Sequence, residues 1–251
     1  MASMEFLHEN LINTTTQFKV DSNTGSVGNI FDKNITKKYN TSGYNSDTST
    51  NISIEFGSAT VIDHIILQNH NLKGFRAFYN SSTANALFTV TQNSATSTYH
   101  SFNTITVTSV QLQVDTAQMA STEKSIGEFI ITRRDVSAFE RNPSVDNFDP
   151  KIDRKQIKIE MPDGGIHLYN IKDKYKAKLK FKYITESFRD DLLEVYNTSL
   201  PFVFVPFPTT TGWPGAAYDV VWTGDFDFNY SDNAKSQGYD GTIMIEQTPS
   251  A

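Results

Sequence analysis

The chain has 251 residues, of which 38% are hydrophobic and 12% aromatic, so it can bury the core of one large or two medium domains and is not disordered throughout. Its net charge of -6 argues against a general nucleic-acid-binding protein, and the absence of cysteine excludes disulfides, thiolate zinc sites and thiol nucleophiles. No window approaches the roughly 18–20 apolar residues of a membrane-spanning helix, and the N-terminus lacks the basic and apolar regions of a secretory signal.

The composition changes near the middle of the chain. Up to about residue 120 the sequence is rich in Asn, Ser and Thr, and beyond residue 153 it is rich in Lys, Phe and Tyr. The segment between them contains Pro143 and Pro150 and no apolar periodicity, which is typical of a linker because proline interrupts helices and sheet ladders. We therefore predict a first domain over residues 1–135, a linker over 136–153 and a second domain over 154–251.

The first domain is predicted to be built from short strands. Ile52, Ile54 and Phe56 alternate with polar residues, which is the period-2 pattern of a strand with one buried face. Similar runs of β-branched and aromatic residues follow, separated by Gly, Asn, Ser and Asp, which favour turns. These runs cover residues 61–69, 75–81, 86–92, 103–115 and 127–133. This succession predicts a jelly-roll β-sandwich.

The second domain is predicted to be antiparallel β with one helix. Residues 156–161 and 166–171 flank a glycine-containing turn and predict a hairpin. In residues 172–183 lysine occupies every second position, and only a strand places the lysines and the intervening apolar residues on opposite faces. Residues 185–197 carry a helical apolar stripe, with Thr185 as the expected N-cap. Further strands are expected over residues 201–208, 218–230 and 241–247. The expected fold class is therefore mainly β.

The sequence contains no recognisable catalytic set. None of the five histidines forms an HExxH motif, and no GxSxG, P-loop or dinucleotide-binding motif is present. His64 and His70 would share one side of an unbroken strand, but no further ligands stand at metal spacing. Asp225 and Asp227 share a strand face, where a solvated surface is the more frequent explanation than an acid–base pair. We therefore expect a protein that is not an enzyme and needs no cofactor.

Charge is distributed unevenly in the second domain. Residues 151–182 contain ten Lys or Arg and four Asp or Glu, whereas residues 183–251 contain two and ten. One interpretation is head-to-tail assembly, in which the basic face of one subunit meets an acidic face of the next. The alternative is that the charges are solvated or neutralise each other within one domain. The expected interface residues are Lys174, Lys176, Lys178, Lys180, Lys182, Asp225, Asp227 and Asp232.

The first domain resembles the discoidin-like (F5/8 type C, galactose-binding-like) jelly roll. The likeness covers most of residues 10–135 and rests on Phe31-Asp32, Tyr39, the strand 52–57, the strand 62–67 and Glu128 in the strand near the end of the domain. In many members an early loop and a late glutamate hold a structural calcium ion. The resemblance therefore implies Asp32, Asn34 and Glu128 as calcium ligands, although Lys33 stands where the family has glycine.

The order of elements as a whole resembles structural proteins of tailed bacteriophages, in which a jelly roll is joined to a tail-type β domain. This resemblance implies a non-enzymatic virion component of the tail or tail tip, made in the host cytoplasm. Its partners would be copies of itself, in a ring or another homo-oligomer, and other tail proteins. Direct contact with nucleic acid is not expected.

An alternative function is a carbohydrate-binding module that adheres to host surface glycans. Such a module needs an exposed aromatic platform at one end of the jelly roll. Tyr39, Tyr44 and Tyr99 are the candidates in the sequence.

Overall fold

The computed structural model describes residues 3–42, 48–133, 139–143, 145–161, 165–198, 201–206, 217–231 and 238–248. The chain forms two compact units. One is built mainly from residues 9–136 and is called here the jelly-roll unit. The other is built from residues 1–8, 137–207 and 218–249 and is called the C-terminal unit.

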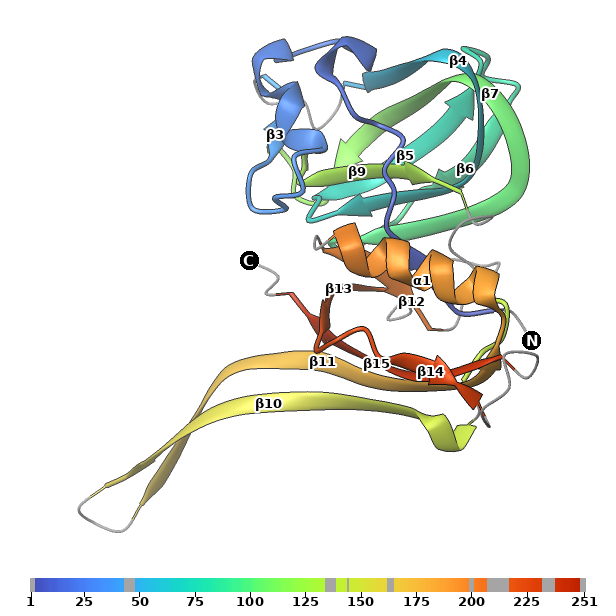
Figure 1. Ribbon diagram of the computed structural model, residues 1–251. Helices are drawn as coiled ribbons and strands as arrows, with labels where there is room; N and C mark the ends of the chain where they lie inside the picture. The colour runs from blue at the N-terminus through green and yellow to red at the C-terminus, as the bar shows by residue number, and fades with distance from the viewer. Residues whose placement is uncertain are drawn as a thin grey trace. The chain divides into compact units, whose positions relative to one another are not determined.

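The jelly-roll unit is a β-sandwich (Figure 1). Its main sheet has the order β2-β4-β7-β5-β6, with β9 also paired to β4, and β3 pairs with β8. Short 3-10 helices at Thr15–Gln17 and Thr24–Ile30 precede the longer strands. The strands are β2 (Phe18–Val20), β3 (Tyr39–Asn40), β4 (Thr50–Gln68), β5 (Leu72–Tyr79), β6 (Ala86–Val90), β7 (Thr98–Ala117), β8 (Ser125–Ile126) and β9 (Glu128–Thr132).

Two long strands connect the layers of this sandwich. The sequence predicts separate strands before and after residues 58–60, but β4 runs through as one strand of 19 residues. Its pairing with β7 shifts register between Glu55 and Thr60 and again between Ile62 and His64, and such bulges bend a strand. The first half of β4 pairs with β2, and the second half pairs with β9. The bent strands thus contribute to both layers of one core, and the predicted jelly-roll β-sandwich is confirmed.

The C-terminal unit is an antiparallel sheet with one helix, as predicted. Its sheet has the order β1-β12-β13-β15-β11-β10, and β14 also pairs with β15. A 3-10 helix at Val145–Asn147 precedes β10. The elements are β1 (Glu5–Leu7), β10 (Phe148–Glu160), β11 (Ile166–Ile184), α1 (Glu186–Thr198), β12 (Phe202–Val205), β13 (Tyr218–Thr223), β14 (Phe228–Tyr230) and β15 (Tyr239–Gln247).

The N-terminal strand belongs to the C-terminal unit. Glu5, Phe6 and Leu7 pair with residues 203–205 of β12, so the jelly-roll unit is inserted between the first and second strands of the other unit. The expected first domain began at residue 1, because a three-residue strand has no periodicity that reveals its distant partner. The expected linker also differs, since residues 148–153 form the start of β10. Pro150 is tolerated there because β10 is an edge strand.

Local patterns in the C-terminal unit fold as the sequence indicates. The hydroxyl of Thr185 accepts a hydrogen bond from the backbone N–H of Phe188 (3.2 Å), which is the predicted N-cap of α1. Phe188, Leu192 and Val195 are buried along one side of this helix. The strand expected over residues 218–230 is interrupted after β13, where Gly224 adopts a φ of 91°.

Candidate functional site

The predicted lysines of β11 lie on its solvent side and form what is called here the lysine stripe. Tyr175, Ala177, Leu179 and Phe181 point into the core on the other side, with exposed fractions of 7% or less. The predicted alternation is therefore confirmed from Lys174 to Lys182. It fails at Tyr183, which is 49% exposed because the pairing with β15 shifts register between Phe181 and Ile184. The stripe consists of Lys174, Lys176, Lys178, Lys180 and Lys182.

Two lysines of the stripe form ion pairs inside the C-terminal unit. The ammonium of Lys174 lies 2.7 Å from Glu246, and that of Lys176 lies 2.9 Å from Asp153 and 3.3 Å from Glu246. The hydrogen bond from Lys174 lowers the pKa of Glu246, and that from Lys176 lowers the pKa of Asp153. Part of the basic charge is thus neutralised within one copy, as the alternative interpretation of the charge split expects.

The remaining lysines of the stripe are exposed. Lys178, Lys180 and Lys182 have no ion pair among the residues that the structure describes. Of the acidic residues expected to face them, Asp225 and Asp227 are exposed in the segment between β13 and β14, and Asp232 lies outside the described residues. A contact between these two sets in an assembly stays a prediction.

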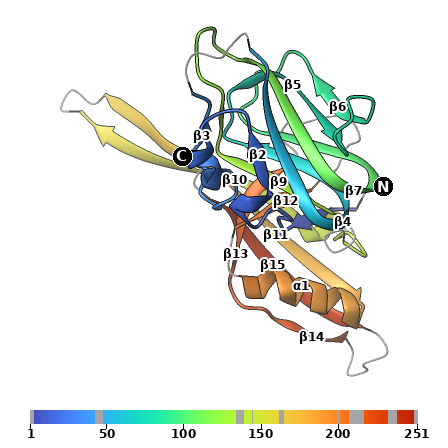
Figure 2. The same cartoon turned by 90° about the horizontal axis from the view of Figure 1, so that it is seen from above.

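The most unusual surface of the C-terminal unit is the outer end of the β10–β11 hairpin, residues 156–161 and 165–171, called here the distal hairpin. These residues extend past the rest of the sheet (Figure 2). The described strands pair them only with each other, whereas β15 pairs with β11 only from Lys176 onward. Seven large apolar side chains here are between 43% and 59% exposed: Ile157, Ile159, Met161, Ile166, Leu168, Tyr169 and Ile171.

Apolar side chains occupy both faces of the distal hairpin. Ile157 stands opposite Tyr169 on one face, and Leu168 stands opposite Lys158 on the other, because directly opposed residues share a face and successive residues alternate. An isolated two-stranded ribbon is marginally stable in water. The sequence predicted this hairpin but not its exposure. The adjacent apolar pair Leu168-Tyr169, which breaks the alternation, was the signal for it.

Two of the three tyrosines predicted to form a glycan-binding platform are buried. Tyr39 is 1% exposed and donates its hydroxyl hydrogen bond to the backbone carbonyl of Ser22 (2.7 Å), and Tyr99 is 3% exposed. Burial raises the pKa of Tyr39. Both rings lie in the interior, because their strands place them on the inward face. Tyr44 lies outside the described residues.

The residues of the expected calcium site are close together. The backbone N–H of Lys33 donates to the Glu128 carboxylate (3.3 Å), and that of Asn34 donates to Asp32 (2.9 Å). Lys33 has a φ of 60°, the left-handed conformation that glycine adopts most readily. This is the position at which the discoidin-like family that the sequence resembles has glycine.

Protein donors contact several of the carboxylate and amide oxygens of the expected calcium site. Asn34 accepts hydrogen bonds from the N–H (3.2 Å) and the hydroxyl (2.6 Å) of Thr36, and the Lys37 ammonium lies 3.9 Å from Asp32. Among the described residues, no group of three or more His, Asp or Glu side chains is placed to hold a metal. Calcium binding by Asp32, Asn34 and Glu128 stays a prediction.

His70, which is buried, and His100, which is partly buried, make the stability of the jelly-roll unit sensitive to acid. Desolvation lowers the pKa of His70 to about 3, with further lowering from His100 and Lys38, and desolvation lowers the pKa of His100 to about 4. Their pKa in the unfolded chain is near 6.5, so below this pH only the unfolded state gains protons. The contribution of the two neutral histidines to the free energy of unfolding is therefore complete above about pH 6.5. It is lost as the pH falls toward their pKa values in the folded protein, about 4 for His100 and about 3 for His70.

We expect the free energy of unfolding of the jelly-roll unit to fall by roughly 2–4 kcal/mol between pH 7 and pH 5. Urea denaturation at the two pH values, monitored by hydrogen exchange of the amides of β4 and β5, measures this change in the free energy of unfolding. His100→Phe, which keeps a ring stacked on Phe88 (3.7 Å between centroids), should remove about half of the loss. An unchanged pH dependence in this variant would contradict the assignment.

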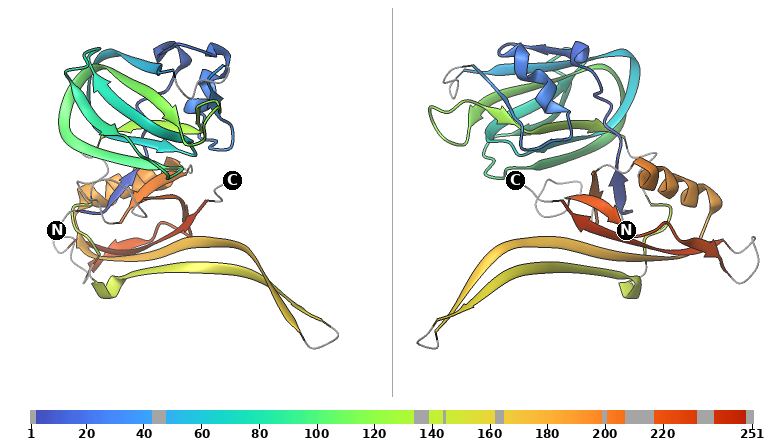
Figure 3. Two further views of the ribbon diagram at one scale, coloured as in Figure 1. Left: turned by 180° about the vertical axis from the view of Figure 1, so that it is seen from behind. Right: turned by 60° about the vertical axis from the view of Figure 1, so that its left-hand side comes forward.

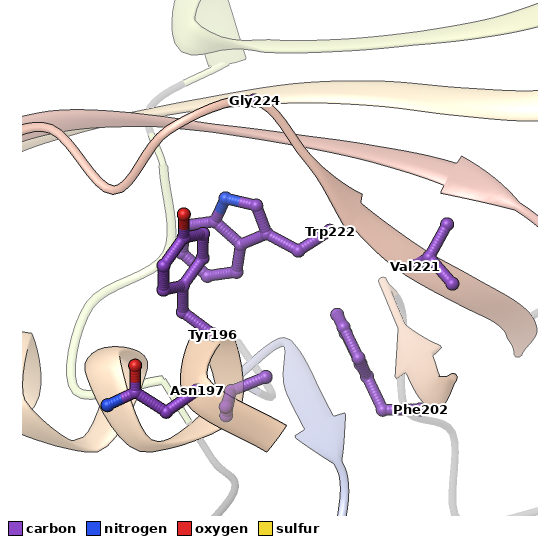
Figure 4. Close-up of a pocket in the computed structure, with 7 residues that line it drawn as sticks. Tyr196, Asn197, Phe202, Val221, Trp222 and Gly224 are labelled. Carbon is purple, nitrogen blue, oxygen red and sulfur yellow. The ribbon is translucent and has the colours of Figure 1, made fainter. Parts of the chain in front are cut away.

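An aromatic pocket, called here the Trp222 pocket, lies in the C-terminal unit between the end of α1 and β12 and β13 (Figure 4). It has a volume of about 320 Å³. The rings of Tyr196 and Trp222 meet edge to face, 5.4 Å apart. The indole nitrogen of Trp222 is buried and has no hydrogen-bond partner among the residues that the structure describes. The lining residues are Val195, Tyr196, Asn197, Phe202, Val221, Trp222 and Gly224.

No helix in the described part of the chain is long and apolar enough to cross a membrane.

The apolar stripe of α1 predicted from the sequence includes Tyr196, but this residue is half-buried at the wall of the Trp222 pocket. Sequence reasoning did not identify this pocket, because its walls come from α1, β12 and β13, which only the tertiary structure brings together.

Comparison with known proteins gives matches among solved structures alone. No protein-family model matches the chain, and no curated protein matches it. A chitosan-binding module 1 from a chitosanase/glucanase of Paenibacillus sp. IK-5 is 17% identical, with a TM-score of 0.42 over 49% of this chain and 98% of the module.

Two further structures are similar to the same extent. Chitosan-binding module 2 of that enzyme, in complex with chitotriose, is 15% identical over 46% of this chain and 94% of the module, with a TM-score of 0.40. CpGH89CBM32-6, produced by Clostridium perfringens, is 16% identical over 50% of this chain and 99% of its own, with a TM-score of 0.40. About half of this chain is thus similar to carbohydrate-binding modules, at low sequence identity.

Proposed function

We propose that this protein is a non-enzymatic structural protein that assembles with copies of itself through the C-terminal unit. The observation that carries the proposal is the exposure of seven large apolar side chains on the distal hairpin. Monomeric proteins rarely expose contiguous apolar surface of this kind, and such patches mark interaction sites. Because both faces of the ribbon are apolar, a partner must cover each of them.

The proposed setting is the tail or tail tip of a virion, with other tail proteins as further partners. Its support is the resemblance of the order of elements to tail-type domains. In an assembly, the exposed lysines Lys178, Lys180 and Lys182 of one copy are proposed to face the acidic residues Asp225 and Asp227 of the next.

The double variant Ile157→Lys and Leu168→Lys tests the assembly. Each substitution places a charge on one face of the distal hairpin, where burial of the wild-type side chain contributes about 1.5–3 kcal/mol. We expect association to weaken at least about tenfold for each face, with a shift from oligomer to monomer in native mass spectrometry.

The matched control is Met119→Lys in the jelly-roll unit. Met119 is 71% exposed, more than any large apolar residue of the distal hairpin, and the other exposed large apolar residues of the described chain lie in the C-terminal unit. This control should assemble like the wild type. A wild-type protein that stays monomeric at micromolar concentration, or a double variant that assembles normally, would refute the proposal.

A second candidate function is carbohydrate binding by the jelly-roll unit. The outward face of β5 and β7 carries Arg76 beside Asp115 (3.4 Å), and the hydroxyl of Ser49 donates to Asp115 (2.7 Å). Gln113 stands directly opposite Arg76. A few convergent polar groups of this kind orient a ligand that offers several hydroxyls.

Chitotriose, the ligand in one of the similar structures, is the first probe for this candidate. Calorimetric titration of the full chain should show binding that Arg76→Ala abolishes and Lys73→Ala leaves intact. No heat at millimolar chitotriose, or equal binding by both variants, would reject this candidate for this ligand.

A further inference from the structure

Three aromatic side chains form a cluster at the Trp222 pocket. The ring centroids of Tyr196, Trp222 and Phe226 lie from 5.4 Å to 5.9 Å apart, and each of these side chains remains partly exposed. The cavity beside them, about 320 Å³, is at the small end of the roughly 300–1,000 Å³ that small-molecule sites span. The pocket thus has the size and the aromatic lining of a site for a small ligand.

The pocket offers ring surfaces and polar oxygen atoms to a ligand. Figure 4 shows the rings of Tyr196 and Trp222 on one side of the pocket and Phe202 and Val221 on the other. The indole nitrogen of Trp222 is buried, so a ligand meets the ring and not its N–H group. The other polar side-chain groups of the lining are the Tyr196 hydroxyl and the Asn197 amide. Because the faces of tyrosine and tryptophan rings attract cations, this lining suits a positively charged ligand that also carries apolar groups.

The segments that form the pocket are acidic. Residues 190–198, 201–206 and 217–228 contain six Asp or Glu and no Lys, Arg or His. Glu194 and Asp225 each adjoin a lining residue in the sequence, and both are exposed. Carboxylates gathered in this way raise the local concentration of cations.

The crowding of these carboxylates is visible at Asp191. Desolvation raises the pKa of Asp191, and the neighbouring acids Glu194, Asp190 and Glu140 raise it further, while His8 lowers it. Like charges near a carboxylate disfavour its ionised form. A cation bound at the end of α1 reduces this repulsion.

Basic side chains of the described chain do not line the pocket. Arg189, the basic residue of α1, has its guanidinium 4.5 Å from the ring centroid of Tyr239. The lysine stripe is on the side of β11 opposite the core into which α1 packs. The distal hairpin extends away from α1 and β13 (Figure 3), and Arg154 and Lys158 form ion pairs within their own hairpin. The charges around the pocket therefore favour a cation from outside the chain.

We propose that the Trp222 pocket binds an organic cation with a methylated ammonium group, of the kind found in choline. The charge lies against the rings of Tyr196 and Trp222, and the methyl groups contact Phe202 and Val221. A primary ammonium ion fits less well, because it loses more hydrogen bonds to water on entering a pocket with apolar walls. Soluble molecules and lipid head groups both carry a methylated ammonium group. The site is separate from the distal hairpin and does not depend on the proposed assembly.

A matched pair of ligands tests the preference for charge. Choline and 3,3-dimethyl-1-butanol have the same shape, but a neutral carbon atom replaces the nitrogen in the second. The full chain with ¹⁵N-labelled tryptophan is titrated with each ligand, and the shift of the Trp222 indole signal gives the dissociation constant. Choline should bind roughly 5- to 30-fold more tightly than its neutral isostere. Equal affinities, or no binding of choline at millimolar concentration, would overturn the proposal.

Variants of Trp222 test the location of the site. Trp222→Leu keeps an apolar side chain but removes the ring, and it should lower the affinity for choline at least about fivefold while changing that for the neutral isostere less. Trp222→Phe retains a ring and should bind choline with intermediate affinity. Saturation transfer from the protein to the methyl groups of choline is the readout for these variants. Unchanged choline binding by Trp222→Leu would place the site elsewhere and overturn the proposal.

A change at the surface tests the role of the acids without disturbing the packing. The double variant Glu194→Gln and Asp225→Asn alters two exposed side chains. It should bind choline roughly 2- to 10-fold more weakly and bind the neutral isostere as the wild type does. The matched control is Glu160→Gln, an exposed acid of the distal hairpin, which should leave both affinities unchanged. A double variant that binds choline as tightly as this control would overturn the selection by charge.

Vesicles distinguish the two sources of the ligand. The full chain is sedimented with vesicles of phosphatidylcholine and, for comparison, of phosphatidylglycerol. Sedimentation with phosphatidylcholine alone, reversed by free choline, would support the site and identify a lipid head group. Binding of free choline without sedimentation would support the site and identify a soluble ligand. Because assembly is measured separately, failure of choline binding would overturn this inference and leave the proposed function standing.

Discussion

Phe6→Ala is expected to destabilise the C-terminal unit by about 3–5 kcal/mol, although the residue stands at the far end of the sequence from most of that unit. The Phe6 side chain is 1% exposed. The centroid of its ring lies 4.7 Å from that of Phe139, 4.8 Å from that of Phe202 and 5.4 Å from that of Phe204. Its removal leaves a cavity in an aromatic cluster and weakens the docking of β1 on β12. A loss of this size is a large part of the stability of an ordinary domain.

Hydrogen exchange during urea denaturation measures this effect separately for the two units. The amides of β11 and β15 should lose protection at lower urea in Phe6→Ala, while those of β4 and β7 should change little. Ile152→Ala, which truncates a 71% exposed side chain of the same unit, is the matched control and should fall within about 0.5 kcal/mol of the wild type. A stable fragment of residues 137–251 would show that β1 is dispensable and would contradict the prediction.

Gly127→Ala is expected to destabilise the jelly-roll unit by about 1–3 kcal/mol. A Cβ atom at Gly127 would lie 2.6 Å from the backbone carbonyl oxygen of Ile35 and 3.1 Å from that of Gln68. Backbone atoms cannot move aside as a flexible side chain does, so the loop that contains Asp32 and Asn34 must shift away from β9. The contact between Lys33 and Glu128 should be lost with it.

Gly57→Ala provides the control, because no atom lies within 4 Å of the corresponding Cβ position. This variant should keep the stability of the wild type within about 0.5 kcal/mol. Thermal unfolding followed by calorimetry gives the comparison, and hydrogen exchange of residues 32–36 reports the loop. Equal melting of the two variants would show that the loop does not pack on Gly127 as described.

The candidate surfaces were predictable to different degrees. The lysine stripe follows from strict alternation, which one strand is enough to produce. The ion pairs of Lys174 and Lys176 with Glu246 were not predictable, because Glu246 stands about seventy residues away and meets them through the pairing of β11 with β15. Tyr39 and Tyr99 could not be assigned to the surface or to the interior, because aromatic residues suit both glycan platforms and cores.

The sequence by itself determined the local elements and the fold class of each unit. Alternation defined the strands, the 3.6-residue stripe with Thr185 defined α1, and each pattern reflects interactions between residues close along the chain. The tertiary structure decided which strands meet. It placed β1 beside β12 and joined two predicted strands into β4. It also left the distal hairpin without a covering layer, since pairing and burial depend on residues distant in sequence, whose contacts no local pattern records.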